Sequence, residues 1–175
     1  MILRYVGCFA PVLLLQFMVK QEIIMKGQGI KDMCTVFSGL EKDCKILAKN
    51  YDCFVNSGMI FTNKRGMKKR SLVMPNQKEY NWISLYGSVT FSQSGKGMPS
   101  NGINEKGLIV EQATLPETVY PMADDRPEVS CLEAIQILLD TCSTVKEAIA
   151  ALQNFRISNQ SGKVHYSNFP FQIRA

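Results

Sequence analysis

The chain after residue 33 alternates between β-prone runs and turn-forming segments. Two such runs, Cys34–Ser38 and Cys44–Asn50, flank a turn-like segment and predict a β-hairpin over residues 34–50. Similar runs predict further strands, which are Met59–Asn63, Ser71–Val73, Trp82–Ser92 and Leu108–Glu111. Before the last of these, Ser94–Gly102 predicts a loop and Asn104–Gly107 a tight turn.

The period of the apolar positions then changes to that of a helix. Ser130 and Glu133 form a capping-box pattern, and the apolar residues that follow predict a helix over residues 130–142. A second pattern of this kind predicts a helix over residues 144–154, and residues 163–166 suggest one more strand. Strands, then helices, then a strand predict an α+β fold with a mainly antiparallel sheet.

Residues 1–33 differ in character from the rest of the chain. The apolar run Val6–Val19 is too short for a transmembrane helix, and no small-x-small cleavage site follows it. Met33 stands directly before Cys34, so translation from Met33 and removal of that methionine would make Cys34 the first residue. We therefore interpret residues 1–33 as a leader, a propeptide or a mis-assigned upstream segment, and expect no stable membrane insertion.

Length and charge indicate an ordinary globular chain. Its 175 residues suffice for one domain with a sizeable core, and 46% hydrophobic and 20% charged residues are typical of soluble proteins. The net charge of +5 is mild. The densest basic stretch, Lys64–Arg70, contains no interleaved aromatic residue, so we interpret it as a solvated loop and expect no nucleic-acid partner.

The cysteines and the histidine predict neither a metal nor a cofactor. None of the six cysteines forms a C-x-x-C pair, and His165 is the single histidine. We interpret most of the cysteines as small buried hydrophobic side chains of a protein in a reducing compartment. This predicts a cytoplasmic protein, with export as the alternative if residues 1–32 are a true signal.

The predicted hairpin places three chemically useful side chains near one another. It folds the segment Lys49–Asp52 beside Cys34 and so gathers a thiol, a cation and a carboxylate. An N-terminal Cys34 would carry a free α-amine with a pKa near 8, which can take the thiol proton. Asp52 could then orient the amine, and Lys49 could stabilise the thiolate. The alternative is a core-filling cysteine beside a surface ion pair worth under about 1 kcal/mol.

Four motifs in this order resemble the choloylglycine hydrolase family, which includes bile salt hydrolases and penicillin V acylases. They are Cys34-Thr35, Lys49–Asp52, Tyr86–Phe91 and Gly102–Leu108. The resemblance runs from about Cys34 to Tyr166. It implies an αββα N-terminal-nucleophile fold, a small-molecule linear amide as substrate, and an N-terminal cysteine that is both nucleophile and base.

The resemblance also assigns roles to individual residues. Cys34 matches the nucleophile and Asp52 the aspartate that holds its amine. Lys49 stands where bile salt hydrolases have an arginine, which keeps the charge but loses bidentate hydrogen bonding. Thr114 falls near the variable oxyanion position, where bile salt hydrolases have an asparagine, so the likeness to bile salt hydrolases is weaker there.

The end of the chain departs from the family pattern. Residues 34–166 match the N-terminal part of the amidase domain, whereas residues 167–175 form an atypical tail, so the αββα sandwich is expected to be truncated in its second half. An enzyme that hydrolyses linear amides is therefore weighed against an inactive truncated remnant. A small binding domain on the same scaffold is the third interpretation, and a homo-oligomer is left open.

Overall fold

The structure is a computed structural model that describes the backbone of residues 35–41, 44–50, 58–72, 77–112, 119–158 and 171–174. In residues 35–50 and 171–174 only the backbone is described, apart from Ala48. The chain divides into two compact units, Met1–Asn56 and Ser57–Ala175. Each unit is described by itself.

The first unit contains the predicted hairpin. Strand β1 (Thr35–Glu41) pairs antiparallel with strand β2 (Cys44–Asn50). Thr35 lies opposite Asn50 at the open end, and Glu41 lies opposite Cys44 at the closed end. The predicted pairing of the two β-prone runs is confirmed for the residues that are described.

The second unit is built on a five-stranded sheet with the order β11-β8-β7-β6-β3. Every neighbouring pair in this sheet is antiparallel, which confirms the predicted mainly antiparallel α+β fold. Its strands are β3 (Met59–Asn63), β6 (Ser88–Ser92), β7 (Asn101–Asn104), β8 (Ile109–Gln112) and β11 (Phe171–Arg174). The predicted strand at residues 163–166 lies outside the described residues, and β11 lies within the segment interpreted as a tail.

The predicted long strand Trp82–Ser92 is wrong, because the segment divides between two sheets. Strand β5 (Asn81–Ile83) pairs with β4 (Lys68–Arg70), whereas β6 belongs to the main sheet. The backbone N–H groups of Leu85 and Tyr86, between β5 and β6, donate to the carbonyl oxygen of Asp140. Tertiary hydrogen bonds of this kind override β propensity, which is context-dependent.

Two other boundaries also differ from prediction. The strand expected at Ser71–Val73 lies earlier, at Lys68–Arg70, and Val73 is outside the described residues. The loop expected at Ser94–Gly102 ends at Ser100, because β7 begins at Asn101. The tight turn at Asn104–Gly107 is confirmed, and Gly107 adopts a φ of 81°, which favours glycine.

Both predicted helices are present, and the first has the predicted cap. Helix α1 (Cys131–Thr141) begins after Ser130, whose hydroxyl accepts from the Glu133 N–H while the Glu133 carboxylate accepts from the Ser130 N–H. Helix α2 (Val145–Ala151) is shorter than the predicted 144–154. Here the Glu147 carboxylate accepts from Ser143 rather than from the N-cap residue.

A further strand pair was not predicted. Strand β9 (Glu128–Val129) pairs in parallel with β10 (Arg156–Ile157). An ion pair between the largely buried side chains of Arg156 and Glu128 joins the two strands. Two-residue strands carry too little periodicity to be recognised in the sequence.

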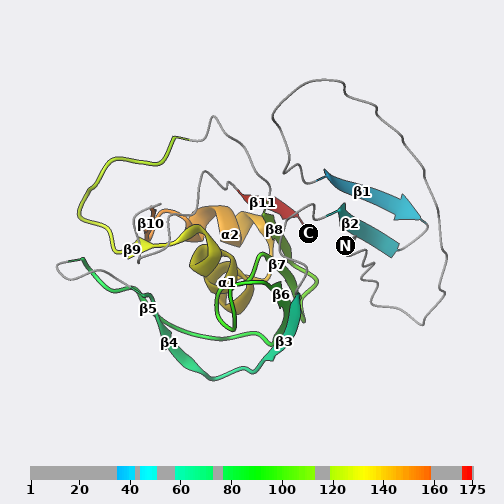
Figure 1. Cartoon of the computed structure of the whole chain (residues 1–175), viewed down its shortest axis with the longest axis horizontal. Coiled ribbons are helices and arrows are strands. Elements are labelled where there is room, and N and C mark those ends of the chain that lie inside the picture. Colours follow the sequence, from blue (N-terminus) through cyan, green and yellow to red (C-terminus); the bar gives the residue numbers. More distant parts are fainter. Residues whose placement is uncertain are drawn as a thin grey trace. The chain divides into compact units, whose positions relative to one another are not determined.

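The core lies between the helices and one face of the sheet. Figure 1 shows α1 and α2 on the same face of the five-stranded sheet, and α1 contacts β7 and β8. Fully buried apolar side chains form the core cluster, among them Leu108, Val110, Ile135, Leu138 and Leu139. Helix packing against the sheet therefore fixes the position of α1, which carries the polar cluster described below.

Replacing Gly102 by alanine is expected to lower the free energy of unfolding by about 1–3 kcal/mol through overpacking. A Cβ at this position would lie 2.7 Å from the Val89 carbonyl oxygen and 2.8 Å from Leu139 Cδ1. Gly87→Ala is the matched control, because a Cβ there would meet its nearest atom at 3.4 Å. Urea unfolding measures both variants. Equal stability of the two would contradict the close packing of α1 against β7.

Candidate functional site

Most of the predicted catalytic residues lie outside the described part of the chain. This applies to Cys34, Asp52 and Thr114. Lys49 lies in β2 opposite Val36, and its side chain is not described. The roles of these four residues therefore stay predictions. The described geometry nearest to them is the pairing of β1 with β2.

The side chains of two other cysteines are described, and their surroundings suit core packing. Cys131 and Cys142 are free and buried. Burial raises the pKa of the Cys131 thiol to about 11 and also raises the pKa of the Cys142 thiol. Because the thiolate is the nucleophile, neither residue is suited to attack a carbonyl at neutral pH.

Thiol labelling at neutral pH is expected to leave Cys131 and Cys142 unmodified in the folded protein. A thiol with a pKa near 11 has roughly a hundredfold less thiolate than an unperturbed cysteine, and burial also blocks the reagent. Iodoacetamide treatment followed by peptide mass mapping measures the rates. The denatured chain is the control, and equally fast labelling of Cys131 in both states would rule out this burial.

A buried polar cluster on α1 was not predicted from the sequence. Asp140 is fully buried, and its carboxylate accepts from Lys69 Nζ at 2.8 Å, Trp82 Nε1 at 2.7 Å and Gln136 Nε2 at 2.9 Å. Lys69 and Trp82 are cross-strand partners in β4 and β5. The cluster therefore holds this two-stranded sheet against α1.

This cluster corrects the interpretation of Lys64–Arg70 as a solvated loop. Part of the stretch is β4, and Lys69 forms an ion pair with Asp140. Arg65 forms an exposed ion pair with Glu105. A sequence signal existed in the i, i+4 spacing of Gln136 and Asp140, which places both side chains on one helix face.

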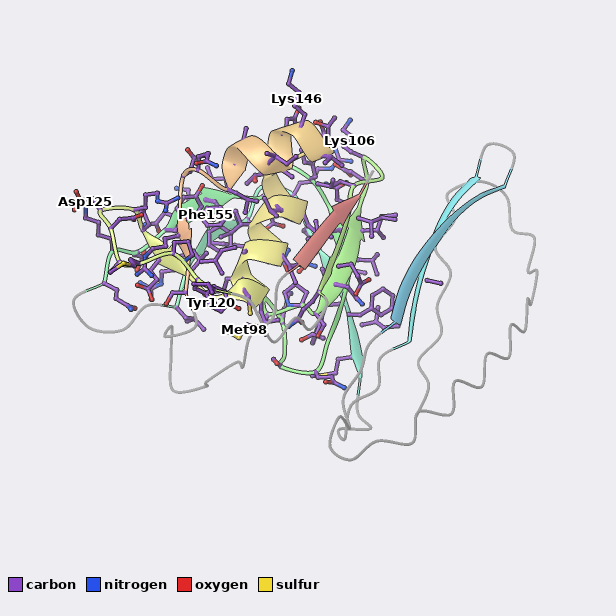
Figure 2. The ribbon with its side chains drawn as sticks, turned by 90° about the horizontal axis from the view of Figure 1, so that it is seen from above. Met98, Lys106, Tyr120, Asp125, Lys146 and Phe155 are labelled. Atoms are coloured by element: carbon purple, nitrogen blue, oxygen red, sulfur yellow. The ribbon has the colours of Figure 1, made fainter. Side chains whose placement is uncertain are left out.

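A cavity of about 270 Å³ opens beside the Asp140 cluster. It is lined by Lys69, Arg70, Leu72, Trp82, Lys96, Gly97, Met98, Glu133 and Gln136. Figure 2 shows Met98 close to one end of α1, and Glu133 and Gln136 of this helix line the cavity together with Met98. The cavity combines apolar walls, basic side chains and a buried amide, a composition that suits a small polar ligand.

A second polar pair lies on the sheet face that turns away from α1. Asn101 Nδ2 donates to Glu111 Oε1 at 3.0 Å, and both side chains are buried. The two residues are cross-strand partners, whereas the next pair, Gly102 and Val110, faces α1. This face thus carries a buried carboxylate three residues before Thr114 in the sequence.

The described ranges contain neither a cluster of metal-ligating side chains nor a membrane-spanning helix. Where side chains are described, no group of three or more histidine, cysteine, aspartate or glutamate residues is placed to hold a metal ion. Neither helix found there has the length and apolar character that crossing a membrane requires.

Solved structures define the class of fold. A mutant of the conjugated bile acid hydrolase from Clostridium perfringens has a TM-score of 0.64 and 20% identity, over 81% of this chain and 44% of its own. Penicillin V acylase from Agrobacterium tumefaciens has a TM-score of 0.54 and 29% identity, over 66% of this chain and 34% of its own. The fold is that of the N-terminal-nucleophile hydrolases, with α+β architecture as predicted.

The family follows from the sequence comparison. The model of the acyl-coenzyme A:6-aminopenicillanic acid acyl-transferase family matches residues 40–167, and the chain belongs to this family. Penicillin V acylase from Pectobacterium atrosepticum is 39% identical over an alignment of 84 residues, and the match covers 44% of this chain and 22% of that protein. The chain thus covers less than half of these relatives, and the predicted choloylglycine hydrolase resemblance is confirmed.

Proposed function

We propose that the chain hydrolyses a linear amide bond through Cys34 acting as an N-terminal nucleophile. The observation that carries the proposal is the β1–β2 register within a chain of this family. Thr35 lies opposite Asn50. Cys34 directly precedes Thr35 in the sequence, and Asp52 follows Asn50 by two residues, so this register supports the proposal that the two residues act together.

The proposed reaction has two steps. The α-amine of Cys34 takes the thiol proton, the thiolate attacks the amide carbonyl carbon, and the amine product leaves with that proton. Water then hydrolyses the thioester, which releases the acid and restores the thiol. A backbone N–H near Thr114 stabilises the oxyanion in both steps.

The neighbouring residues support the amine and the thiolate. Asp52 holds the α-amine in position, and Lys49 favours the thiolate through its charge. This chemistry requires removal of residues 1–33, because only a terminal cysteine has a free α-amine. The high thiol pKa of Cys131 and the raised pKa of Cys142 leave these two residues as core side chains.

Penicillin V is the first substrate to test. One relative that matches this chain is named as a penicillin V acylase. By the resemblance, Thr114 falls near the position where bile salt hydrolases have an asparagine, and its hydroxyl cannot imitate an amide. A conjugated bile salt is therefore the second substrate.

Trapping of the acyl-enzyme tests the proposal. The purified protein is incubated with penicillin V or a conjugated bile salt, quenched in acid and examined by intact and peptide mass spectrometry. We expect a chain that begins at Cys34 and carries the acyl group on that residue.

Two variants make the trapping experiment decisive. Cys34→Ser should lose the thioester adduct, whereas Cys142→Ala, which removes a buried thiol, should retain it. A mature chain that still contains residues 1–33, or the absence of any adduct from folded protein, would refute the proposal and favour the inactive remnant.

A further inference from the structure

The ribbon formed by β4 and β5 has an inner and an outer face. Figure 1 shows the two strands as a sheet of their own, apart from the five-stranded sheet. Lys69 and its cross-strand partner Trp82 donate to Asp140 and so define the inner face. Side chains alternate along a strand, so the neighbouring cross-strand pair, Lys68 and Ile83, belongs to the outer face.

The outer face exposes large apolar side chains. Ile83 is 49% exposed and Leu85 is 57% exposed, whereas Ser84 between them is buried. Met67, directly before β4, is 51% exposed. One exposed aliphatic residue is ordinary in a soluble protein, but several at one place on the surface indicate a contact surface. None of these three apolar residues lines the cavity described above.

Positive charge is concentrated around this ribbon. Residues 64–86 contain six basic residues and one acidic residue, and their net charge of +5 equals that of the whole chain. The rest of the chain therefore has no net charge. Three of the six cations are neutralised by ion pairs, which join Lys69 to Asp140, Arg65 to Glu105 and Arg70 to Glu79.

Lys64 and Lys68 are the cations that these ion pairs leave over at the outer face. Both are exposed, and within the described part of the chain neither has an ion-pair partner. Lys68 lies opposite the exposed Ile83, and its long side chain can carry the ammonium group past this apolar neighbour to an anion. The outer face thus combines unpaired positive charge with exposed aliphatic side chains.

We propose that this outer face, formed by Lys64, Met67, Lys68, Ile83 and Leu85, binds the surface of a membrane that contains anionic lipids. The lysines attract the anionic headgroups, and the apolar side chains enter the boundary between headgroups and acyl chains. Such peripheral binding requires no membrane-spanning helix. None of these residues belongs to the chemistry proposed for Cys34, so either proposal can fail without the other.

Two other occupants fit the outer face less well. A second copy of the chain that presented the same face would bring Lys64 and Lys68 close to their own counterparts, and like charges across an interface repel. An acidic segment of another protein would match the charge, but its side chains need pockets for recognition, and the three apolar residues lie outside the described cavity. A fluid lipid surface needs no pocket.

Sedimentation of the full chain with vesicles tests the proposal. One set of vesicles contains one part phosphatidylglycerol to two parts phosphatidylcholine, and the other set contains phosphatidylcholine alone. We expect at least about tenfold stronger binding to the anionic set, and added salt should reduce this preference. Every variant keeps residues 1–33, so any contribution of that segment is the same in all of them.

Matched variants assign the binding to the outer face. Lys68→Gln should weaken binding to the anionic vesicles about fivefold, because each lysine at such a surface contributes about that factor. Lys146→Gln should change it by under about twofold, because Lys146 projects outward from α2 (Figure 2). Leu85→Gln should weaken binding about fivefold, whereas Ile149→Gln should not, although Ile149 of α2 is also 57% exposed.

The urea midpoint of each variant verifies that it is folded. Equal binding of the folded variants, or equal binding of the protein to the two sets of vesicles, would overturn the proposal. Binding of soluble polyglutamate as tight as that of the anionic vesicles would assign the face to an acidic protein segment instead. A dimer that forms without vesicles and is dissociated by Leu85→Gln would assign it to a second copy.

Discussion

Replacing Asp140 by alanine is expected to lower the free energy of unfolding by about 3–5 kcal/mol, because it removes the fully buried carboxylate to which the partly buried Lys69 and two further donors are bound. Lys69 Nζ, Trp82 Nε1 and Gln136 Nε2 would all lose their acceptor at once. These three donors come from two strands and from α1 itself, so the loss separates β4 and β5 from the helix. The backbone bonds from Leu85 and Tyr86 to the carbonyl at position 140 do not depend on the side chain.

Urea unfolding followed by Trp82 fluorescence measures this effect. Asp140→Asn keeps the shape and one acceptor, and it should fall between the alanine variant and the unmodified protein. Asp124→Ala is the matched control, because Asp124 pairs with Arg126 in an exposed position and should change stability by under about 1 kcal/mol. An Asp140→Ala variant as stable as this control would show that the cluster contributes little.

The elements that the sequence predicts best are those with local signals. The hairpin of β1 and β2 follows from two β-prone runs around a turn, and α1 follows from its capping box. Both signals depend on residues within a few positions of one another. The physical cause and the sequence pattern therefore coincide in these elements.

The errors arise where distant residues determine the backbone. Trp82–Ser92 has the composition of one strand, yet it divides because Leu85 and Tyr86 donate to Asp140 more than fifty positions later. Lys69 was assigned to a solvated loop for the same reason, since its partner lies 71 positions away. No window of local sequence contains these contacts.

The candidate sites show the same division. Cys34 is predicted because its position after Met33 and before the hairpin has a chemical meaning in the sequence, and its role stays a prediction. The unpartnered Oε1 of Gln136 has no such signal in the sequence. Nε2 of the same amide donates to Asp140, and Oε1 is then left without a partner among the described residues. Three-dimensional packing is needed to reveal an unsatisfied atom.

A single residue added before Cys34 is expected to slow acylation by about 10²–10⁴-fold under the proposed mechanism. The α-amine would then form a peptide bond, which cannot take the thiol proton. The comparison uses two chains, one that begins at Cys34 and one that begins with alanine followed by Cys34. Pre-steady-state release of the amine product from penicillin V measures the acylation rate of each.

The pH dependence separates loss of the base from loss of the fold. In the chain that begins at Cys34, acylation should rise with pH through a pKa near 8, as the α-amine loses its proton. In the extended chain the α-amine belongs to the added alanine and Cys34 has none, so the residual rate should follow the thiol instead and continue to rise above that pH. One alanine added after Ala175 is the matched control and should leave the profile unchanged. Equal rates and equal profiles for all three chains would exclude the α-amine of Cys34 as the catalytic base.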